Sequence, residues 1–271
     1  MQGSRTDLAA EELPQGGGEL EGVRSSVSQR DGFQVTRVEV LDERGEVALC
    51  KPRGTYITVD MEMFFQRREN AFERAVTLLS RYLSELFTLP EGGSVLVAGL
   101  GNPAITPDAV GPETAALTLA TRHLKERMPE EFSAFRPVSV CRTGVLGTTG
   151  MESSDVIRAL CGAVKPDAVV VVDALAARET DRLCRTVQLT DSGIVPGSGV
   201  GNDRAELSRR VLGIPVTAVG VPTVVDAGDG LIVTPRDIDR YVKDAGKLIA
   251  YALNLALHPA LTLGDVDMFV G

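Results

Sequence analysis

The stretch "VVVVDALAAR", Val169 to Arg178, decides the fold class of this chain. Its run of valines predicts a strand that is buried on both faces, as strands are in parallel sheets covered by helices on each side. The strand ends in one carboxylate, Asp173. An acidic side chain at the end of so apolar a strand requires a partner or a function.

Outward from this strand, the chain alternates predicted strands with loops and helices, which favours a doubly wound sheet. We therefore expect an α/β fold with a mostly parallel sheet flanked by helices, of the phosphorylase/hydrolase-like kind. A small N-terminal strand pair, 33–41 with 54–60, is expected around the turn-forming "DERGE". The other predicted strands are 94–100, 137–141, 167–178, 185–191 and 215–227, and the predicted helices are 63–87, 113–127, one ending near 163–166, 204–211 and 233–259.

Two regions of different composition divide the chain. Residues 1–28 are polar and Gly-rich, so we expect a mobile N-terminal tail. Residues 29–271 contain the alternating pattern without a long linker, which predicts a single α/β domain.

Composition excludes several classes of protein. The 271 residues carry a formal net charge of -9, which disfavours binding to nucleic acid. The longest apolar runs have the length of strands, so no membrane segment is expected. The four cysteines are widely spaced without a C-x-x-C pair, and no early apolar stretch resembles a signal peptide. We therefore expect free thiols and a cytoplasmic location.

Two carboxylates follow Val-rich strand patterns and are candidate catalytic residues. Asp108 lies in the loop after "VLVAGL", and Asp173 follows Val169–Val172. Loops at the carboxyl ends of parallel strands converge, and neighbouring carboxylates can divide into one acid and one base. The alternative is that each residue caps a helix or forms a turn. Asp226 also ends a predicted strand and is a third candidate, for which capping is the favoured role.

A second candidate is the Gly-rich loop "PGSGVGN", 196–202. Such a loop lets a ligand approach the backbone closely, so a peptide-binding or oxyanion role is one interpretation and a tight turn is the other. "GLGNPA", 99–104, supplies only part of a dinucleotide-binding pattern. The candidate substrate-binding residues of the loop are Gly197, Ser198, Gly199, Gly201 and Asn202.

The two histidines, His123 and His258, both fall in predicted helices, so we expect structural roles for them. Without a histidine at a strand end, a Ser or Cys triad is disfavoured. A metal site built from histidine and carboxylates is disfavoured for the same reason, so no metal and no cofactor are expected.

The motifs "RTDLAAEE", "GLGNPAITPDAVGP", "TGVLGTTGMESSD", "VVDALAAR" and "DSGIVPGSGVGNDRAELS" together resemble those of germination proteases. The resemblance implies an endopeptidase that degrades small acid-soluble spore proteins in the cytoplasm of the spore. It also implies a homotetrameric zymogen that is activated by loss of an N-terminal segment. It assigns the essential aspartates to Asp108 and Asp173, and the processing site to the bond between Asp7 and Leu8. Longer family members carry an insertion after the position of Asp226, where this chain has only "AGDG".

The family's fold is similar to that of hydrogenase-maturation endopeptidases, which bind metal with two carboxylates and a histidine. Here Asp108 and Asp173 match the carboxylates, but "GSGVGNDRAELS" contains no histidine. This favours a metal-free mechanism in which one aspartate activates water. A metal-dependent processing peptidase, with Asp226 as a possible third ligand, is one alternative. A non-catalytic module that binds an anion or nucleotide through residues 99–102 and 197–202 is another.

Overall fold

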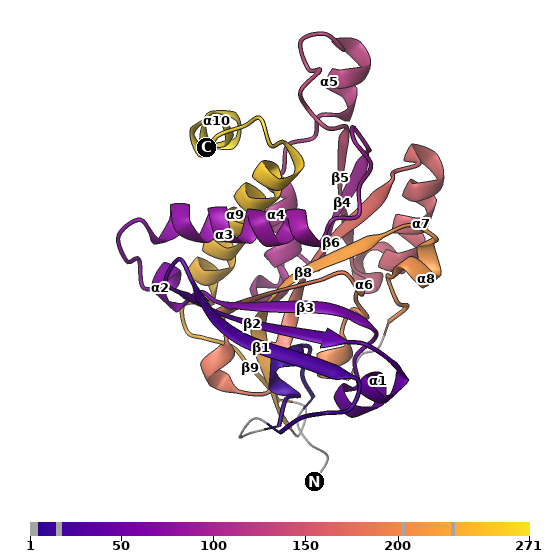
Figure 1. Ribbon diagram of the computed structural model, residues 1–271. Helices are drawn as coiled ribbons and strands as arrows, with labels where there is room; N and C mark the ends of the chain where they lie inside the picture. The colour runs from indigo at the N-terminus through magenta and orange to yellow at the C-terminus, as the bar shows by residue number, and fades with distance from the viewer. Residues whose placement is uncertain (1–4, 15–17, 202–203, 229–230) are drawn as a thin grey trace.

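The computed structural model describes residues 5–14, 18–201, 204–228 and 231–271 (Figure 1). In that part of the chain nine strands form one sheet in the order β1-β2-β3-β7-β8-β6-β4-β5, with β9 paired to β8. The strands are β1 (Val23–Arg30), β2 (Phe33–Val40), β3 (Gly54–Asp60), β4 (Val95–Leu100), β5 (Val138–Gly144), β6 (Ala168–Ala177), β7 (Thr186–Thr190), β8 (Val216–Gly228) and β9 (Leu231–Val233).

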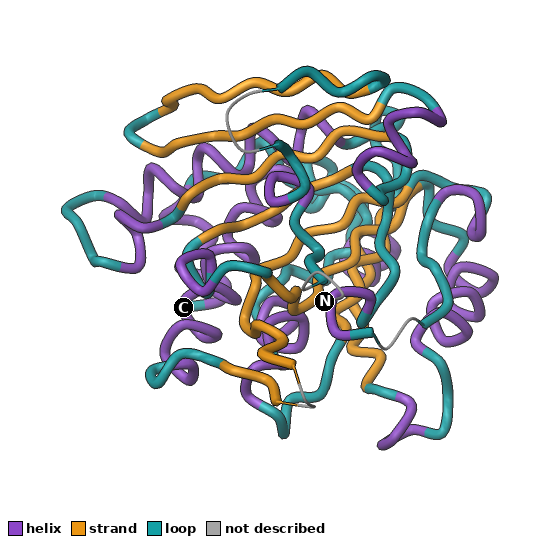
Figure 2. Tube along the Cα trace, turned by 90° about the horizontal axis from the view of Figure 1, so that it is seen from below, coloured by secondary structure: helices purple, strands orange, loops and turns teal. Residues whose placement is uncertain are grey.

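Helices lie on both sides of the strands, as the turned view of Figure 2 shows. Helices α3, α4 and α9 cover one face, and α7 and α8 cover the other. The described helices are α1 (Glu43–Leu49), α2 (Glu62–Phe65), α3 (Ala71–Leu86), α4 (Val110–Ala116), α5 (Arg122–Arg127), α6 (Leu146–Thr149), α7 (Ser153–Val164), α8 (Arg209–Leu212), α9 (Ile238–Leu257) and α10 (Leu263–Val270).

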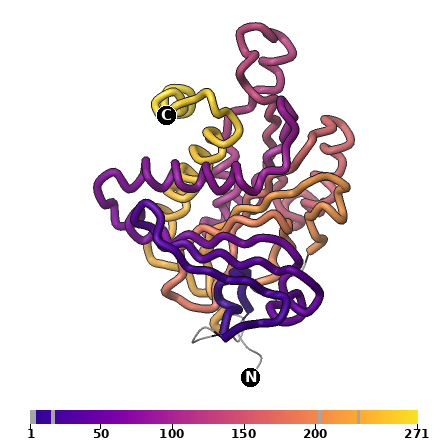
Figure 3. Tube along the Cα trace, viewed as in Figure 1, coloured from indigo at the N-terminus to yellow at the C-terminus, as the bar shows by residue number. Residues whose placement is uncertain are grey.

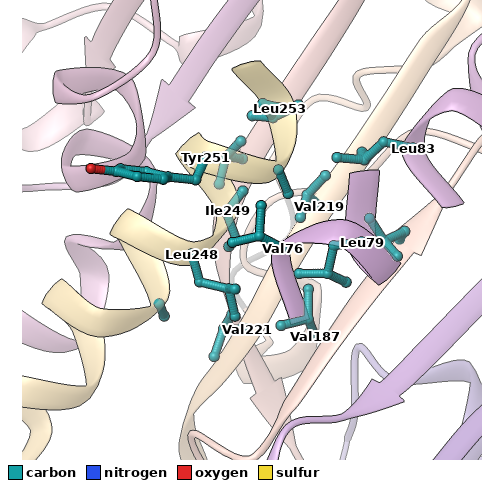
Figure 4. Packing of buried hydrophobic residues seen from close by; sticks show 14 of the residues in the cluster. Val76, Leu79, Leu83, Val187, Val219, Val221, Leu248, Ile249, Tyr251 and Leu253 are labelled. Atoms are coloured by element: carbon teal, nitrogen blue, oxygen red, sulfur yellow. The ribbon is translucent and has the colours of Figure 1, made fainter. Parts of the chain in front are cut away.

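The valines of β6 show why this sheet has two covered faces. Val170 and Val172 belong to the larger core cluster, in which α3 and α9 pack on the strands (Figure 4). Val169 and Val171 point the other way, into the cluster under α7. Successive side chains of a strand alternate between faces, so a continuous valine run buries both. The prediction of a strand buried on both faces is confirmed.

One side of the sheet is parallel and the other side is antiparallel. Strands β5, β4, β6 and β8 run in the same direction. β7, β3, β2 and β1 then extend the sheet as antiparallel neighbours. The predicted α/β class with flanking helices is confirmed, and the parallel part is limited to β8, β6, β4 and β5, with β5 at the edge of the sheet. Figure 3 follows the chain from the indigo N-terminal strands to the yellow C-terminal helices.

The N-terminal region differs from the predicted mobile tail. Within the described part of residues 1–28, Leu8 and Ala9 are fully buried, and β1 begins at Val23. The predicted boundary at residue 28 therefore falls inside a strand. The composition was misleading because a few apolar side chains are enough to dock this segment on the sheet.

Two expectations fail for local reasons. "DERGE" was expected to form a turn, but it begins helix α1, because the Asp42 side chain caps that helix by accepting the N–H groups of Arg44 and Gly45. The helix predicted over 63–87 is broken into α2 and α3, where Arg67 and Asn70 adopt positive φ.

Two further predicted helices are also interrupted. The helix over 113–127 is divided into α4 and α5. The side-chain amide of Asn254 in α9 donates to the carbonyl of Leu117 and accepts the N–H of Leu119, so these backbone groups do not continue the helix. The helix over 204–211 shrinks to α8, because Leu207 pairs with Ile194 as a β-bridge. Helix α10 and strands β1 and β9 were not predicted.

Candidate active site

A cavity lies where β4 ends beside β6. β4 pairs with β6 from Ala168 to Val172, whereas β8 continues beside β6 as far as Ala177. The second half of β6 therefore extends past the end of β4, where the chain turns into the loop that carries Asp108. The sequence places one candidate carboxylate on each of these two elements.

Asp173 lies on β6 at the first position beyond the β4 pairing, and only 6% of the residue is exposed. Its carboxylate accepts the N–H of Ala174 at 2.9 Å. Burial, followed by the negative charges of Asp108 and Asp7, raises the pKa of Asp173 well above its usual range. These surroundings therefore favour the protonated carboxyl group of Asp173 over the carboxylate.

Asp108 ends a short 3-10 turn, Thr106–Asp108, and is half-buried. Its carboxylate accepts the N–H of Asn102 at 2.8 Å. Burial raises the pKa of Asp108, and the Asn102 hydrogen bond and the charge of Arg204 oppose that rise. Two neighbouring carboxyl groups in different surroundings can thus supply an acid and a base.

The loop around Asp108 is held by contacts to β8 and α9. Thr223 donates to the carbonyl of Pro107 at 2.7 Å, and Thr106 donates to the carboxylate of Asp239 at 2.9 Å. Gly101 begins the loop at φ 109°, and a Cβ there would lie 2.0 Å from the Asp108 carbonyl oxygen. The loop can close in this way only around a glycine.

Asp108 and Asp173 line one cavity of about 570 Å³. The loop after β7 contributes Pro196, Gly197 and Arg204 to its wall. The charge of Arg204 lowers the pKa of both Asp108 and Asp173, in opposition to burial. Arg204 was not predicted as a site residue, although a cation close to the glycine-rich loop of an acidic chain could have indicated a binding role.

Asp7 is a third carboxylate on this cavity and was not predicted to lie there. Its backbone N–H donates to the carbonyl of Ala176 at 2.9 Å, and its carboxylate accepts the Ala176 N–H at 2.8 Å. The next residue, Leu8, is fully buried. We expected the Asp7–Leu8 bond to be accessible in a mobile tail, and the structure instead covers it.

The glycine-rich loop contacts this N-terminal segment. Ser198 donates to the Asp7 carboxylate at 2.6 Å, and a Cβ on Gly199 would lie 2.4 Å from that carboxylate. Gly197 and Gly201 flank the turn Ser198–Val200 with positive φ. The loop is thus both a tight turn and a close approach to a peptide segment. Asn202 lies outside the described residues.

The remaining sequence candidates lie elsewhere. The Asp226 carboxylate accepts the N–H of Gly228 at 2.9 Å, which is a turn-forming contact. His258 is buried against Arg136, and burial lowers its pKa to about 4. His123 lies on α5. Among the described side chains, no three His, Cys, Asp or Glu residues are grouped so that they could hold a metal ion.

No helix in the described ranges is long and apolar enough to cross a membrane.

Comparison with known proteins agrees with the sequence motifs. The germination protease family matches residues 5–229. The chain is 39% identical to the germination protease of Caldanaerobacter subterraneus subsp. tengcongensis, over 99% of this chain and 98% of that protein. It is 42% identical to the germination protease of Bacillus cytotoxicus, over 90% of this chain and 68% of that protein. Among solved structures, the [NiFe] hydrogenase maturation protease HycI from Thermococcus kodakarensis KOD1 aligns with 64% of this chain and 98% of its own, at 22% identity and a TM-score of 0.39.

This α/β protein with paired carboxylates in a strand-end cavity is a protease. The chain belongs to the germination protease family. The alignment with the Caldanaerobacter protein spans 319 positions, more than the 271 residues of this chain, so that relative contains segments that this chain lacks.

Proposed function

We propose that this protein is an endopeptidase that initiates the degradation of small acid-soluble spore proteins and uses Asp108 and Asp173 as an acid–base pair. The observation that carries the proposal is that both carboxylates line one cavity where β4 ends beside β6. Family membership supports a protein substrate. The spore substrate, the spore-core cytoplasm and a homotetrameric assembly are part of the proposal because the sequence motifs resemble those of germination proteases.

The two environments suggest a division of roles. Asp173 is the more deeply buried and lies near two other carboxylates, so it holds the proton. Asp108, exposed to the cavity, is ionised and takes a proton from water as the water oxygen attacks the scissile carbonyl carbon. Asp173 donates its proton toward the carbonyl oxygen, and Arg204 stabilises the negative charge that develops there. When the C–N bond breaks, Asp108 passes the proton taken from water to the leaving amine, and the proton on the former carbonyl oxygen returns to Asp173 as the C=O bond forms again.

We further propose that the chain is a self-processing zymogen cut between Asp7 and Leu8. The motif "RTDLAAEE" supports this position. The processed end lies beside the proposed catalytic pair, because Asp7 lines the same cavity.

The pair is tested by Asp108→Asn and Asp173→Asn, which keep the side-chain shape and remove proton transfer. General acid or base catalysis contributes about 10²- to 10⁴-fold, so each variant should lose at least about 100-fold in the turnover of a spore-protein substrate. Asp226→Asn is the matched control at a strand end outside the cavity, and it should retain near-normal turnover. Circular dichroism and oligomer size verify the fold. Near-normal turnover by either cavity variant would remove that residue from the mechanism.

A further inference from the structure

Strand β8 contains a β-bulge beside the cavity of the proposed catalytic pair. On β6, Leu175 pairs with Pro222 of β8. The next residue of β6, Ala176, pairs with Val224, so Thr223 is an extra residue in β8, and it lines the cavity. Proline has no N–H to donate to a sheet and within sheets is found at bulges and edges, which explains the interruption at this point. Bulges often lie next to active sites, where they turn a side chain toward the site.

The bulge changes the face of the sheet to which the β8 side chains point. Val221, before the bulge, packs in the larger core cluster (Figure 4). Val225, after the bulge, packs with Leu175 and Ala177 in another cluster. In an uninterrupted strand, residues four apart point to the same face, so the extra residue has shifted the alternation. The bulge thus presents Thr223 to the cavity while Val225 stays buried.

The Thr223 side chain reaches the loop that carries Asp108. Only 1% of Thr223 is exposed. Its hydroxyl donates to the carbonyl of Pro107 at 2.7 Å, and its own carbonyl accepts the Thr234 hydroxyl at 2.8 Å. Pro107 directly precedes Asp108 in the chain. The Thr223 hydroxyl therefore holds the peptide group that leads into Asp108.

The other contacts of Asp108 show what this peptide group controls. The Asp108 N–H, which belongs to the same peptide group, donates to the carbonyl of Ile105 at 2.8 Å. The Asp108 carboxylate accepts the N–H of Asn102 at 2.8 Å. Rotation of the Pro107–Asp108 peptide group would disturb both bonds, because it would move the N–H and turn the side chain that follows. The bond from Thr223 opposes that rotation.

We propose that Thr223 is a positioning residue for the reaction: its hydroxyl fixes the Pro107–Asp108 peptide group, so that the Asp108 carboxylate stays bonded to Asn102 and directed at the attacking water. The inference rests on the proposed function, because it concerns the residue to which that function assigns the role of base. Thr223 itself transfers no proton.

The variant Thr223→Val tests the hydroxyl, because valine keeps the branched shape in the buried site and cannot donate. Thr223→Ser keeps the donor and is the rescue variant. The variants are compared as chains of equal intact mass. In Thr223→Val, kcat for a spore-protein substrate should fall at least about tenfold while KM stays within about twofold, because a misplaced base slows the chemical step more than binding. Thr223→Ser should recover kcat to within about threefold of the wild type.

The pH profile adds a result that a merely structural role would not give. Burial raises the pKa of Asp108, and the Asn102 N–H opposes that rise. A weaker bond from Asn102 therefore raises the pKa further, so the acid limb of kcat/KM should move to higher pH in Thr223→Val and return in Thr223→Ser. The charged groups around Asp108 are the same in both variants: Asp7, Asp173, Arg204 and, through Thr106, Asp239.

Thr186→Val is the matched control for loss of a buried threonine hydroxyl. The Thr186 hydroxyl lies in β7 and has no hydrogen-bond partner among the described residues. This control should keep the wild-type kcat, KM and pH profile. Hydrogen exchange of residues 101–109, followed by mass spectrometry, reports on the loop without catalysis and should be faster in Thr223→Val than in the other chains.

The outcomes separate this inference from the proposed function. Circular dichroism verifies folding. If Thr223→Val does not fold, Thr234→Val removes the bond to the Thr223 carbonyl and should change the same measurements in the same direction. Near-normal kcat or unchanged exchange in the folded variant, or equal losses in Thr223→Val and Thr223→Ser, would overturn the positioning role while Asp108→Asn still shows its loss. Normal turnover of Asp108→Asn would instead contradict the acid–base pair on which the inference rests.

Discussion

Asp173 links the apolar strand to the proposed chemistry. The burial that makes β6 a good central strand is also the largest cause of the raised pKa of Asp173 within it. A group held protonated in the folded state is costly to ionise there. The same residue should therefore serve the reaction and weaken the fold as the pH rises.

This conflict gives a pH-dependent prediction for Asp173→Asn. Folding raises the pKa of Asp173. The protonated side chain therefore contributes its full stabilisation to the fold below the pKa of the unfolded chain, about 3.9, and this stabilisation is lost as the pH rises through the folded pKa. The asparagine variant cannot ionise. As the pH rises above about 4, the free energy of unfolding of the wild type should therefore fall relative to that of the asparagine variant, until the pH passes the raised folded pKa of Asp173.

Thermal unfolding by circular dichroism across that pH range measures the difference between the two chains. Asp226→Asn makes the same change from carboxylate to amide at a position outside the cavity, so it serves as the control. A difference that does not change as the pH rises from about 4 would contradict the raised pKa of Asp173.

At the scale of elements, the β4 loop decides where Asp108 lies. Gly101→Ala would place a Cβ against the Asp108 carbonyl oxygen at a φ that strains any L side chain. We expect it to cost about 1–3 kcal/mol of unfolding free energy and, by displacing Asp108, at least about tenfold in substrate turnover. Denaturant unfolding and cleavage assays measure the two losses.

Gly162→Ala is the matched control. Gly162 lies in α7, and a Cβ there meets nothing within 4 Å. The replacement should raise stability by about 0.5–1 kcal/mol through helix propensity and leave turnover unchanged. If Gly101→Ala were as well tolerated as Gly162→Ala, the close approach at Gly101 would not be needed to position Asp108.

The elements also show what the sequence could predict. The valine runs of β4 and β6 and the carboxylates after them are local patterns, so the central strands and the positions of Asp108 and Asp173 followed from them. Asp7 meets Ala176 across 169 residues of chain, a contact that no local pattern encodes. Arg204 reaches the cavity only because its loop folds back over the ends of β4 and β6. The missed residues are therefore those placed by tertiary contacts.

For the whole molecule, the choice between the two peptidase mechanisms can be tested with chelators. The donor groups of the described residues include no cluster of three that could hold a metal ion. Extensive treatment with EDTA and dialysis should therefore leave cleavage of a spore-protein peptide unchanged within about twofold, well below the loss expected when a catalytic ion is removed. Activity that disappears and returns with a divalent ion would favour the metal-dependent alternative.

The proposed self-processing of the chain depends on how its N-terminal segment is held. Leu8 is fully buried and the Asp7 carbonyl accepts a hydrogen bond from Gln188, so under this proposal the Asp7–Leu8 bond must leave its docked position before it is cut. Glu11→Gln weakens docking outside the cleaved pair, because the amide loses one of the oxygens that accept the Arg178 and Glu179 N–H groups. A loss of about 1 kcal/mol in docking should speed processing about fivefold, as followed by intact mass over time. Glu21→Gln, at an exposed ion pair with Arg44, should process at the wild-type rate. Slower processing of a folded Glu11→Gln chain would mean that the docked segment is itself the form that is cut.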